Sequence, residues 1–389
     1  MPLADDDDDK WVYRPHTAAK HEVLGKYLIP WVNKLTSYNL AVDNPNKIRV
    51  VDCFAGRGSY VDTDSTDPID LEFVSTPAEI PGSPQLILDR LTNRADQFDS
   101  AECVFIEAHP TNYETLSDTI SGTTGYADSI SVQCKHGKFQ NTVLDVVEDL
   151  DGSDCPTFFF IDPFGFSSLD YDVVTEIGST PQFEFLITFM SRDMNRFLES
   201  EDHEEALNTV FGNESWRDMI GEYDSTNWVP LVEYYTDRLE ANGPDQTFEY
   251  MISEPETTQT IYYLVYGTNH SEGLRTMREV MSYCGTGKFA YAPKQPEYDR
   301  NQARLFGGGD ETKQFLQDRF EEYIVTFDKL VETCTEERRY QDATESDYRE
   351  ALRELEQEGV VDIQRITSKE TGIQGSDLID FHDSTEFMG

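Results

Sequence analysis

Residues 48–60, IRVVDCFAGRGSY, constrain the fold of this chain more than any other stretch. Residues 48–51 form an apolar, β-branched run of the kind that makes a buried parallel strand. Asp52 ends this run, and a turn that contains Gly56 and Gly58 follows directly. In open α/β sheets, ligands bind beyond the carboxyl ends of strands, where glycine lets backbone N–H groups approach them. The stretch therefore predicts a ligand-binding turn at the edge of a parallel sheet.

Two later apolar runs also end on an acid. Residues 103–106 lead to Glu107, and residues 158–161 lead to Asp162. Because the carboxyl ends of parallel strands share one edge of a sheet, we expect the two acids and Asp52 to line one rim. The alternative is that strand ends simply favour acids in a very acidic protein.

Strand and helix patterns alternate through the first three quarters of the chain. Besides the three runs above, strands are predicted at residues 130–134, 183–190, 247–253 and 260–268. Helices are predicted at residues 83–91, 112–120, 139–150, 171–177 and 272–281. Ser83 is the predicted N-cap of the first helix, and residues 62–81 before it are predicted to be a surface loop. This alternation predicts an α/β fold with a Rossmann-like mixed sheet of seven strands, whose last two form an antiparallel hairpin.

The chain divides into four predicted segments. Residues 1–46 are an acidic head and a helical segment, residues 47–293 hold the sheet, residues 294–310 are a linker rich in glycine and proline, and residues 311–389 are a second domain. That last domain has helices at residues 312–323, 327–332 and 346–357, followed by strands at 360–366 and 378–381, which is typical of a winged helix. Its third helix is predicted to begin at an N-cap serine, Ser346, and to end at Gly359. Either nucleic-acid binding or a docking role suits this domain.

The N-terminal helical segment has several potential cations for so acidic a chain: Arg14, His16, Lys20, His21 and Lys26. In one interpretation these side chains pair with surface acids on a helix that packs on the sheet. In the other, His16, Lys20 and His21 face the ligand or a phosphate.

The formal net charge is −44, from 75 acids and 31 bases spread along the chain. Such a surface repels itself in dilute buffer and is tolerated where salt screens it, which predicts a haloarchaeal cytoplasm. The charge disfavours nonspecific nucleic-acid binding at ordinary salt. No apolar run has the length of a membrane span, and six scattered cysteines without C-x-x-C spacing indicate neither a zinc site nor a disulfide framework.

Several separated motifs resemble those of the three-Cys-motif partner proteins (TcmP). They are HTAAKHEVLGKYL, DCFAGRGSY, PGSP at a helix start, FIE, FFFIDPFG and YYLVYGTNHSEGLRTM. They occur in the same order and cover roughly residues 14–285. The family looks like a class I S-adenosylmethionine-dependent methyltransferase, and its members are found alongside a three-cysteine-motif protein.

The resemblance implies a cofactor site around the first turn. The turn would hold the methionine part of S-adenosylmethionine, and Glu107 would hold the ribose. The implied cofactor-binding residues are Asp52, Phe54, Ala55, Gly56, Gly58, Tyr60 and Glu107. No acid follows the strand at residues 130–134, so the side chain expected to meet the adenine amine is missing. Val61 occupies the position of the third glycine of dinucleotide folds, which disfavours a nicotinamide-dependent enzyme.

The stretch Asp162-Pro163-Phe164-Gly165 is similar to the equivalent stretch of tRNA guanine-N2 dimethyltransferases. In amino-directed nucleic-acid methyltransferases an acid or amide here, with the first proline's carbonyl, hydrogen-bonds an exocyclic amine. An aromatic ring then stacks on the extruded base. Phe164 replaces the second proline and Gly165 the usual aromatic, so stacking would fall to Phe164 or Phe166. Core packing is the alternative for both rings.

The sequence thus predicts S-adenosylmethionine-dependent methyl transfer to an amine, with a nucleic-acid base as acceptor and no metal. Asp162, Pro163 and Phe164 are the predicted catalytic residues; His16, Lys20, His21 and Phe166 are the predicted substrate-binding residues. The alternative is a non-catalytic partner that uses the methyltransferase-like scaffold to dock a three-Cys-motif protein. The missing adenine-side acid, the altered aromatic motif and the acidic surface support that alternative.

Overall fold

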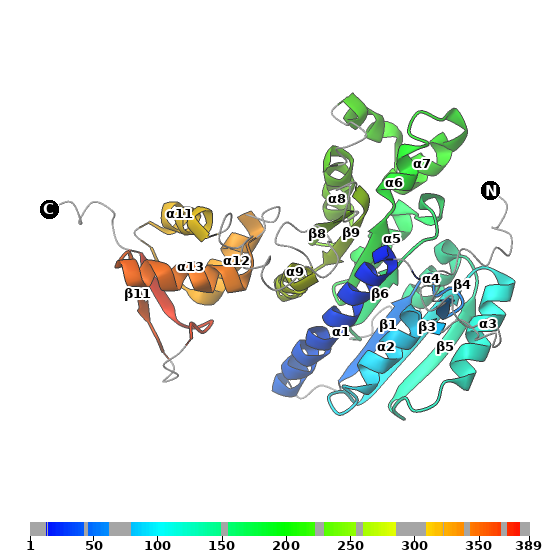
Figure 1. The fold of residues 1–389 in the computed structure, drawn as a ribbon, viewed down its shortest axis with the longest axis horizontal. Coiled ribbons are helices and arrows are strands. Elements are labelled where there is room, and N and C mark those ends of the chain that lie inside the picture. Colours follow the sequence, from blue (N-terminus) through cyan, green and yellow to red (C-terminus); the bar gives the residue numbers. More distant parts are fainter. Residues whose placement is uncertain are drawn as a thin grey trace, which may run out of the picture. The chain divides into compact units, whose positions relative to one another are not determined.

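A computed structural model describes residues 13, 15–42, 46–61, 79–148, 155–221, 229–253, 260–284, 309–321, 323–337, 343–366 and 372–381. The chain forms two compact units, Met1–Thr276 and Met277–Gly389 (Figure 1). This division falls inside α9 (Ser271–Cys284), before the predicted boundary at residue 293. Most of the predicted linker lies outside the described residues, so the four predicted segments stay predictions.

The first unit contains the predicted seven-stranded sheet. Its strands are β1 (Lys47–Asp52), β4 (Ser100–Glu107), β5 (Ile130–His136), β6 (Thr157–Ile161), β7 (Phe183–Phe189), β8 (Gln246–Ser253) and β9 (Thr260–Thr268). They lie in the order β5-β4-β1-β6-β7-β9-β8. The first five are parallel, and β9 runs antiparallel to both β7 and β8. The predicted Rossmann-like mixed sheet of seven strands with its terminal hairpin is confirmed.

Helices cover both faces of this sheet (Figure 1). They are α1 (Pro15–Val42), α2 (Ser83–Thr92), α3 (Pro110–Gly122), α4 (Phe139–Glu148), α5 (Tyr171–Gly178), α6 (Ser191–Asn195), α7 (Glu204–Phe211), α8 (Val229–Asn242) and α9, with short 3-10 turns at Phe166–Ser168, Glu201–His203 and Glu214–Gly221. Side chains of α4, α5, α7 and α8 form one hydrophobic core with Phe159 of the sheet. On the opposite face, Tyr27 and Trp31 of α1 pack against Phe158, with ring centroids 5.3 and 6.0 Å apart.

Alternation along each strand decides which side chains face α1. Val51, Ile106 and Ile161 belong to the core under α4 and α5. Because successive side chains point to opposite faces, the residues that follow them, Asp52 and Glu107 among them, face the α1 side of the sheet. The local sequence therefore brings all three strand-end acids to one face as well as to one edge.

Two local features of the first unit differ from the sequence prediction. Ser59–Val61 (β2) and Glu79–Pro81 (β3) pair as an antiparallel hairpin after the glycine turn, where only a loop was expected. The N-cap of α2 is Gly82, not Ser83, which is the first helical residue. The hydroxyl of Ser83 is thereby free for another partner.

The second unit has its own hydrophobic core, which includes Leu316, Leu330, Leu352 and Phe381. Its elements are α11 (Gly309–Phe320), β10 (Ile324–Thr326), α12 (Phe327–Glu337), α13 (Glu345–Glu358), β11 (Val361–Gln364) and β12 (Leu378–Phe381). The strands form an antiparallel sheet in the order β10-β12-β11. The three helices and two final strands were predicted; β10 was not, and the winged-helix assignment stays a prediction.

The N-cap of helix α13 lies two residues earlier than the sequence suggested. Its N-cap is Thr344, not Ser346, and Asp347 completes a capping box by accepting from the N–H and hydroxyl of Thr344 at 2.8 and 2.7 Å. Gly359, in the left-handed conformation, ends the helix as predicted.

Three further observations concern the described residues as a whole. None of their helices combines the length and apolarity needed to cross a bilayer. No group of three or more His, Cys, Asp or Glu side chains among them could hold a metal ion. All six cysteines are free thiols.

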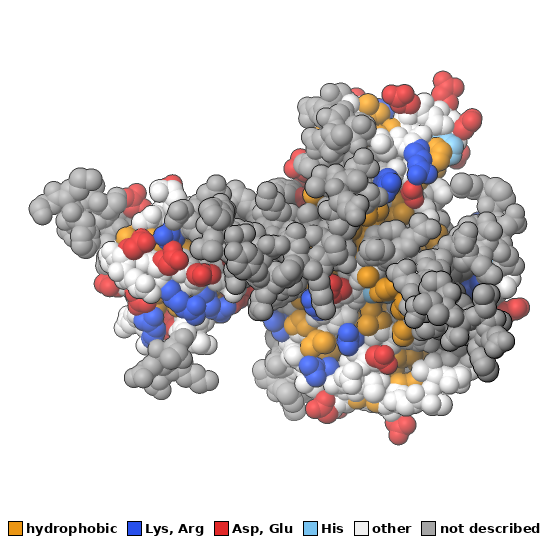
Figure 2. All heavy atoms as spheres, in the orientation of Figure 1, with side chains coloured by type: hydrophobic (Ala, Val, Ile, Leu, Met, Phe, Trp, Pro, Cys, Tyr) orange, Lys and Arg blue, Asp and Glu red, His pale blue; other side chains and the backbone are white. Residues whose placement is uncertain are grey.

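On the face drawn in Figure 2, acidic side chains are spread over both units and are not confined to one patch.

Candidate cofactor and substrate site

The strand-end acids meet where the direction of chain progression through the sheet reverses. From β1 the chain continues to β4 and β5 on one side and to β6 and β7 on the other, which makes β1 the topological switch point. Asp52 pairs in register with Phe105 of β4 and with Phe160 of β6. Glu107 and Asp162 each lie two residues beyond those partners. Glu107 and Asp162 thus lie on either side of Asp52 and two residues closer to the carboxyl ends of their strands, at the edge where open α/β sheets bind ligands.

The glycine turn after β1 is held to the neighbouring strands by its backbone. The N–H of Cys53 donates to the carbonyl of Phe160 at 2.9 Å, and that of Ala55 donates to the carbonyl of Ile106 at 2.9 Å. Gly56 and Gly58 then have φ of 62° and 83°, the left-handed region that residues other than glycine rarely adopt. A Cβ on Gly58 would also lie 3.2 Å from Leu116. The turn therefore requires glycine at position 58 on two grounds.

Asp52 is fully buried beneath this turn. Burial raises the pKa of its carboxyl to about 7, and the hydroxyl of Ser83 and the N–H of Phe54 oppose this shift by hydrogen-bonding the carboxylate. The Phe54 N–H to Oδ1 distance is 3.2 Å, while Oδ2 has no hydrogen-bond partner. Buried carboxylate oxygens nearly always have a partner, so Oδ2 is an acceptor that suits a ligand.

Glu107 is buried on the other side of the turn and has partners for both oxygens. Oε2 accepts from the N–H of Gly56 at 3.0 Å, and Oε1 accepts from the N–H of His109 at 2.6 Å. Burial raises the pKa of this carboxyl, and these bonds, with one from Asn112, lower it. Each carboxylate oxygen can accept a second bond, so Glu107 both holds the glycine turn and retains acceptor capacity.

Asp162 lies beneath the first turns of α1. Its Oδ2 forms an ion pair with the ammonium of Lys20, and the two side chains are 11% and 13% exposed. Oδ1 is buried without a hydrogen-bond partner. His21 follows Lys20 and is also buried, and its ring lies 5.7 Å from that of Tyr60. We term Lys20, His21, Tyr60 and Asp162 the Asp162 cluster.

The structure thus brings two of the N-terminal cations to the predicted site. Lys26, in contrast, pairs with Glu22 at 2.6 Å on the outer surface of α1, as the packing interpretation expects. The backbone of His16 lies in α1, but its side chain lies outside the described residues.

The residues after Asp162 divide between surface and core. Phe164 is 58% exposed, whereas Pro163 is buried. Phe166 is 6% exposed, and its ring packs 5.6 Å from that of Phe197. Phe166 thus packs in the core, as the core-packing alternative expects, and its role in substrate binding stays a prediction. Phe54 also packs partly into the core, 5.2 Å from Phe139.

Sequence reasoning missed two polar residues at this rim. Ser83 hydrogen-bonds Asp52, although the PGSP motif suggested only a capping role. Thr188 of β7 follows Ile187, the register partner of Ile161, so it lies beside Asp162 on the α1 face. Its hydroxyl is buried without a hydrogen-bond partner. A threonine near the end of an otherwise apolar strand, FEFLITFM, was the available signal.

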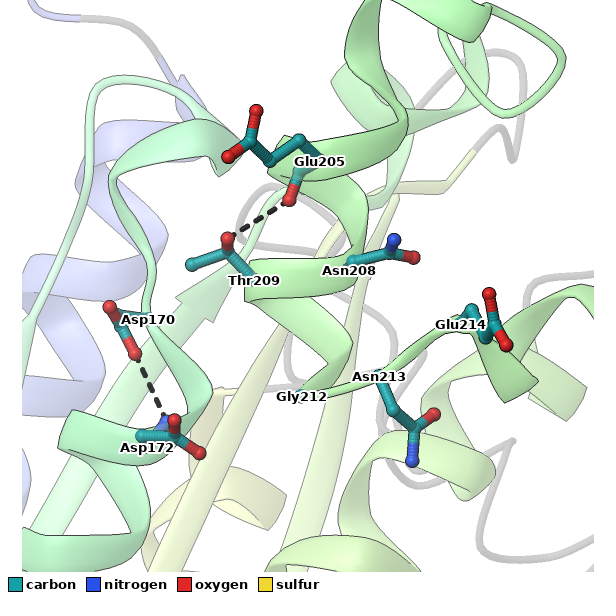
Figure 3. A pocket seen from close by; sticks show the side chains of 8 residues that line it. All are labelled: Asp170, Asp172, Glu205, Asn208, Thr209, Gly212, Asn213 and Glu214. Carbon is teal, nitrogen blue, oxygen red and sulfur yellow. Dashed lines mark hydrogen bonds between the residues drawn. The ribbon is translucent and has the colours of Figure 1, made fainter.

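A cavity of about 590 Å³ in the described part of the chain is lined by none of these rim residues (Figure 3). Its lining contains four carboxylates and no base: Asp170, Asp172, Glu205, Asn208, Thr209, Gly212, Asn213 and Glu214. Asp170 is occupied there as the N-cap of α5, accepting from the N–H of Asp172 at 3.1 Å. A repulsive acidic lining of this kind does not suit a phosphate or a nucleic acid.

Comparison with known proteins finds only weak structural similarity. No protein-family model matches the chain, and no curated protein matches it significantly. Among solved structures, protein LPL1258 of Legionella pneumophila, from family DUF519, has a TM-score of 0.39 and 13% identity, over 69% of this chain and 91% of that one.

Two methyltransferases are also among the solved structures that resemble it. Trm1 from Pyrococcus horikoshii, in complex with S-adenosyl-L-methionine, has a TM-score of 0.32 and 11% identity, over 76% of this chain and 68% of that one. Human methyltransferase-like protein 13, in complex with SAH, has a TM-score of 0.29 and 12% identity, over 68% and 91%. Because these TM-scores are below 0.5, the fold assignment rests on the strand order of the chain itself.

Proposed function

We propose that the chain is an S-adenosylmethionine-dependent methyltransferase whose acceptor is an amine of a nucleic-acid base. The observation that carries the proposal is the convergence of Asp52, Glu107 and Asp162 on one face and one edge of the sheet, at the topological switch point. Asp52 and Asp162 each keep a buried oxygen without a partner. A ligand with suitably placed donors would supply the missing hydrogen bonds.

The residues around the glycine turn fit this cofactor. The free Oδ2 of Asp52 suits the ammonium of the methionine part, and Glu107 suits the ribose hydroxyls. The positive φ of Gly56 and Gly58 shapes the turn that would hold it, and Phe54, Ala55 and Tyr60 belong to the same turn and hairpin. When bound, the cofactor supplies an electrophilic methyl group on a sulfonium.

The Asp162 side of the rim fits the acceptor. The unpartnered Oδ1 of Asp162 would accept a hydrogen bond from the amine, and the carboxylate would stabilise the positive charge that develops on nitrogen. The exposed ring of Phe164 offers a surface on which the base can stack. Holding the amine in line with the methyl group supplies most of the rate acceleration.

Calorimetric titration with S-adenosylmethionine in molar KCl tests the cofactor site. We expect the unsubstituted protein to bind it and Gly58→Val to lose binding, because a side chain there meets Leu116 and a disfavoured φ of 83°. Gly125→Val is the matched control: Gly125 also has a positive φ, 95°, but nothing lies within 4 Å of its would-be Cβ. No binding by the unsubstituted protein would refute the proposal.

A non-catalytic partner protein is the second candidate, and one observation favours it. Lys20 already occupies one oxygen of Asp162, in the place where an acceptor amine would bind. To separate the two candidates, the protein is incubated with methyl-labelled cofactor and total nucleic acid in molar salt. Transfer that disappears in Asp162→Ala supports the enzyme, whereas no transfer together with co-purification of a three-Cys-motif protein supports the partner.

The finer assignments belong to the same proposal. We place the chain among the three-Cys-motif partner proteins, in the cytoplasm of a halophilic archaeon, with a winged helix as its second unit. The net charge of −44 supports a high-salt setting. Loss of the folded state on dialysis from molar KCl into dilute buffer would support this origin, and full stability in dilute buffer would count against it.

A further inference from the structure

His21 is a buried member of the Asp162 cluster. It is 6% exposed, and its ring lies 5.7 Å from Tyr60 and 5.9 Å from Tyr13. Its Nε2 is buried and has no hydrogen-bond partner. A buried ring nitrogen without a partner is costly, and a histidine that served only to fill space could be replaced by an apolar ring at no loss.

The surroundings of this ring keep it uncharged. Burial and, to a smaller extent, the ammonium of Lys20 lower the pKa of His21 to about 4, although the carboxylate of Asp162 acts in the opposite direction. Among the described residues, the phenols of Tyr60 and Tyr13 also face the ring, and burial raises the pKa of Tyr60. At neutral pH the ring is therefore uncharged, and its buried Nε2 carries a lone pair when the ring proton is on Nδ1.

We propose that Nε2 of His21 accepts the proton that the acceptor amine releases during methyl transfer, an inference that rests on the proposed function. The amine nitrogen forms a bond to the methyl carbon as the carbon–sulfur bond breaks, and the electron pair of that bond stays on sulfur. The nitrogen is then positively charged. It gives one proton to Nε2, keeps the N–H electron pair and becomes neutral, and the imidazolium later passes the proton to water.

The neighbouring groups are less suited to this step. Oδ2 of Asp162 is neutralised by Lys20, and Oδ1 is needed to orient the amine. Glu107 is held by the N–H groups of Gly56 and His109 at the far side of the turn. A protonated exocyclic amine of a base is a strong acid, so a weakly basic imidazole is a sufficient acceptor.

The test measures single-turnover methyl transfer from labelled cofactor to random-sequence RNA and DNA oligonucleotides in molar KCl. We expect His21→Gln to transfer about 100-fold more slowly, the lower end of general-base effects, with the cofactor Kd unchanged within about twofold. Imidazole added to His21→Ala should restore the rate, and substituted imidazoles of higher pKa should restore it further. His203→Gln, which removes a histidine that packs on Phe197 outside the cluster, is the control.

A second readout does not depend on transfer. The ring resonances of His21, identified by their absence in His21→Gln, are titrated by NMR in the complex with S-adenosylhomocysteine. A pKa well below the ordinary value near 6.5 supports the inference, and a value at or above it overturns the inference, because the ring would then be charged.

The outcomes separate this inference from its premise. If the unsubstituted protein binds no cofactor or transfers no methyl group, the proposed function fails and the role of His21 fails with it. If it transfers and His21→Gln transfers equally fast, only the role of His21 fails. Slow transfer by His21→Ala without rescue by any imidazole indicates a structural role for His21 and also overturns the inference that it accepts the proton.

Discussion

Two carboxylates on the α1 face of the sheet have opposite surroundings. Glu184 on β7 accepts from the hydroxyls of Tyr27 at 2.7 Å and Thr268 at 3.1 Å, and Tyr266 hydrogen-bonds Tyr27 at 2.7 Å. We term these four residues the Glu184 network. In the Asp162 cluster, by contrast, Oδ1 of Asp162 and Nε2 of His21 have no hydrogen-bond partner.

This difference indicates that one part of α1 has a structural role and another part contributes to the proposed site. Tyr27 is in the middle of α1, so the satisfied Glu184 network holds this helix on the sheet. Lys20 and His21, two turns earlier, can then be positioned over Asp162 although some polar atoms there lack partners. A satisfied buried network rigidifies a fold, whereas an unsatisfied one costs stability that a ligand can restore.

The largest effect we expect is on methyl transfer in Asp162→Ala. Loss of a group that stabilises developing charge should slow transfer about 100- to 1,000-fold. Asp162→Asn should lose less, because its amide oxygen still accepts a hydrogen bond. The double variant Lys20→Met/Asp162→Ala should have the same free energy of unfolding as the unsubstituted protein in denaturant unfolding, because an apolar replacement of a buried ion pair is often neutral. A large loss of stability in the double variant would mean that the Asp162 cluster, like the Glu184 network, has a structural role.

In the Glu184 network the effect should be on folding. Glu184→Ala removes the acceptor shared by buried hydroxyls, and we expect the free energy of unfolding to fall by about 3 kcal/mol. Glu176→Ala, an exposed glutamate on α5, should change it by less than about 0.5 kcal/mol. Denaturant unfolding at fixed salt measures both, and a Glu184→Ala protein that is stable but inactive would reverse the roles of the two regions.

Cofactor affinity should depend on pH through Asp52. Its pKa of about 7 leaves the carboxylate largely protonated at pH 6 and charged at pH 8. Binding of the cofactor ammonium should therefore strengthen about tenfold over this interval, as calorimetry can measure. Asp52→Asn should bind weakly at both values, and an equal pH dependence in this variant would assign it to another group.

The same raised pKa has a consequence for stability with a definite sign. Because the unfolded chain releases the Asp52 proton first, the free energy of unfolding falls as the pH rises from about 4 to 7. Asp52→Asn should remove this part of the slope.

The smallest effect distinguishes two buried tyrosines. Tyr27→Phe should cost about 1 kcal/mol, because Glu184 loses a hydrogen bond. Tyr235→Phe should be neutral or stabilising, since the buried hydroxyl of Tyr235 has no hydrogen-bond partner. Thermal unfolding of the two variants side by side measures the difference. Equal losses of stability would mean that hydrogen bonding of the tyrosine hydroxyl does not contribute to stability.

The sequence predicts the rim of this site well because its signals are local. Short apolar runs that end on Asp52, Glu107 and Asp162 predict strands, and alternation then places the acids on one face. Tyr27 and Glu184 are 157 residues apart, and no local pattern pairs them. Periodicity likewise cannot tell that Phe166 turns into the core while Phe164 stays exposed, because both rings follow the same strand end.

Small strands and caps escaped prediction for a different reason. β10 has three residues and acquires its strand form only by pairing with β12. Ser83 looked like an N-cap because it precedes a proline, but the extended backbone of Gly82 takes that position and leaves the serine hydroxyl to Asp52. Tertiary contacts decided each of these cases.

Gly82 joins the glycine turn to the start of α2 by direct backbone contact. Its N–H donates to the carbonyl of Gly58 at 2.8 Å, and a Cβ at position 82 would lie 2.6 Å from that same oxygen. Even alanine would push two main chains apart, with no flexible side chain to absorb the displacement. A saturation library selected for the folded protein should therefore return glycine alone at position 82, while the neighbouring position 85, half-buried on α2, accepts many residues.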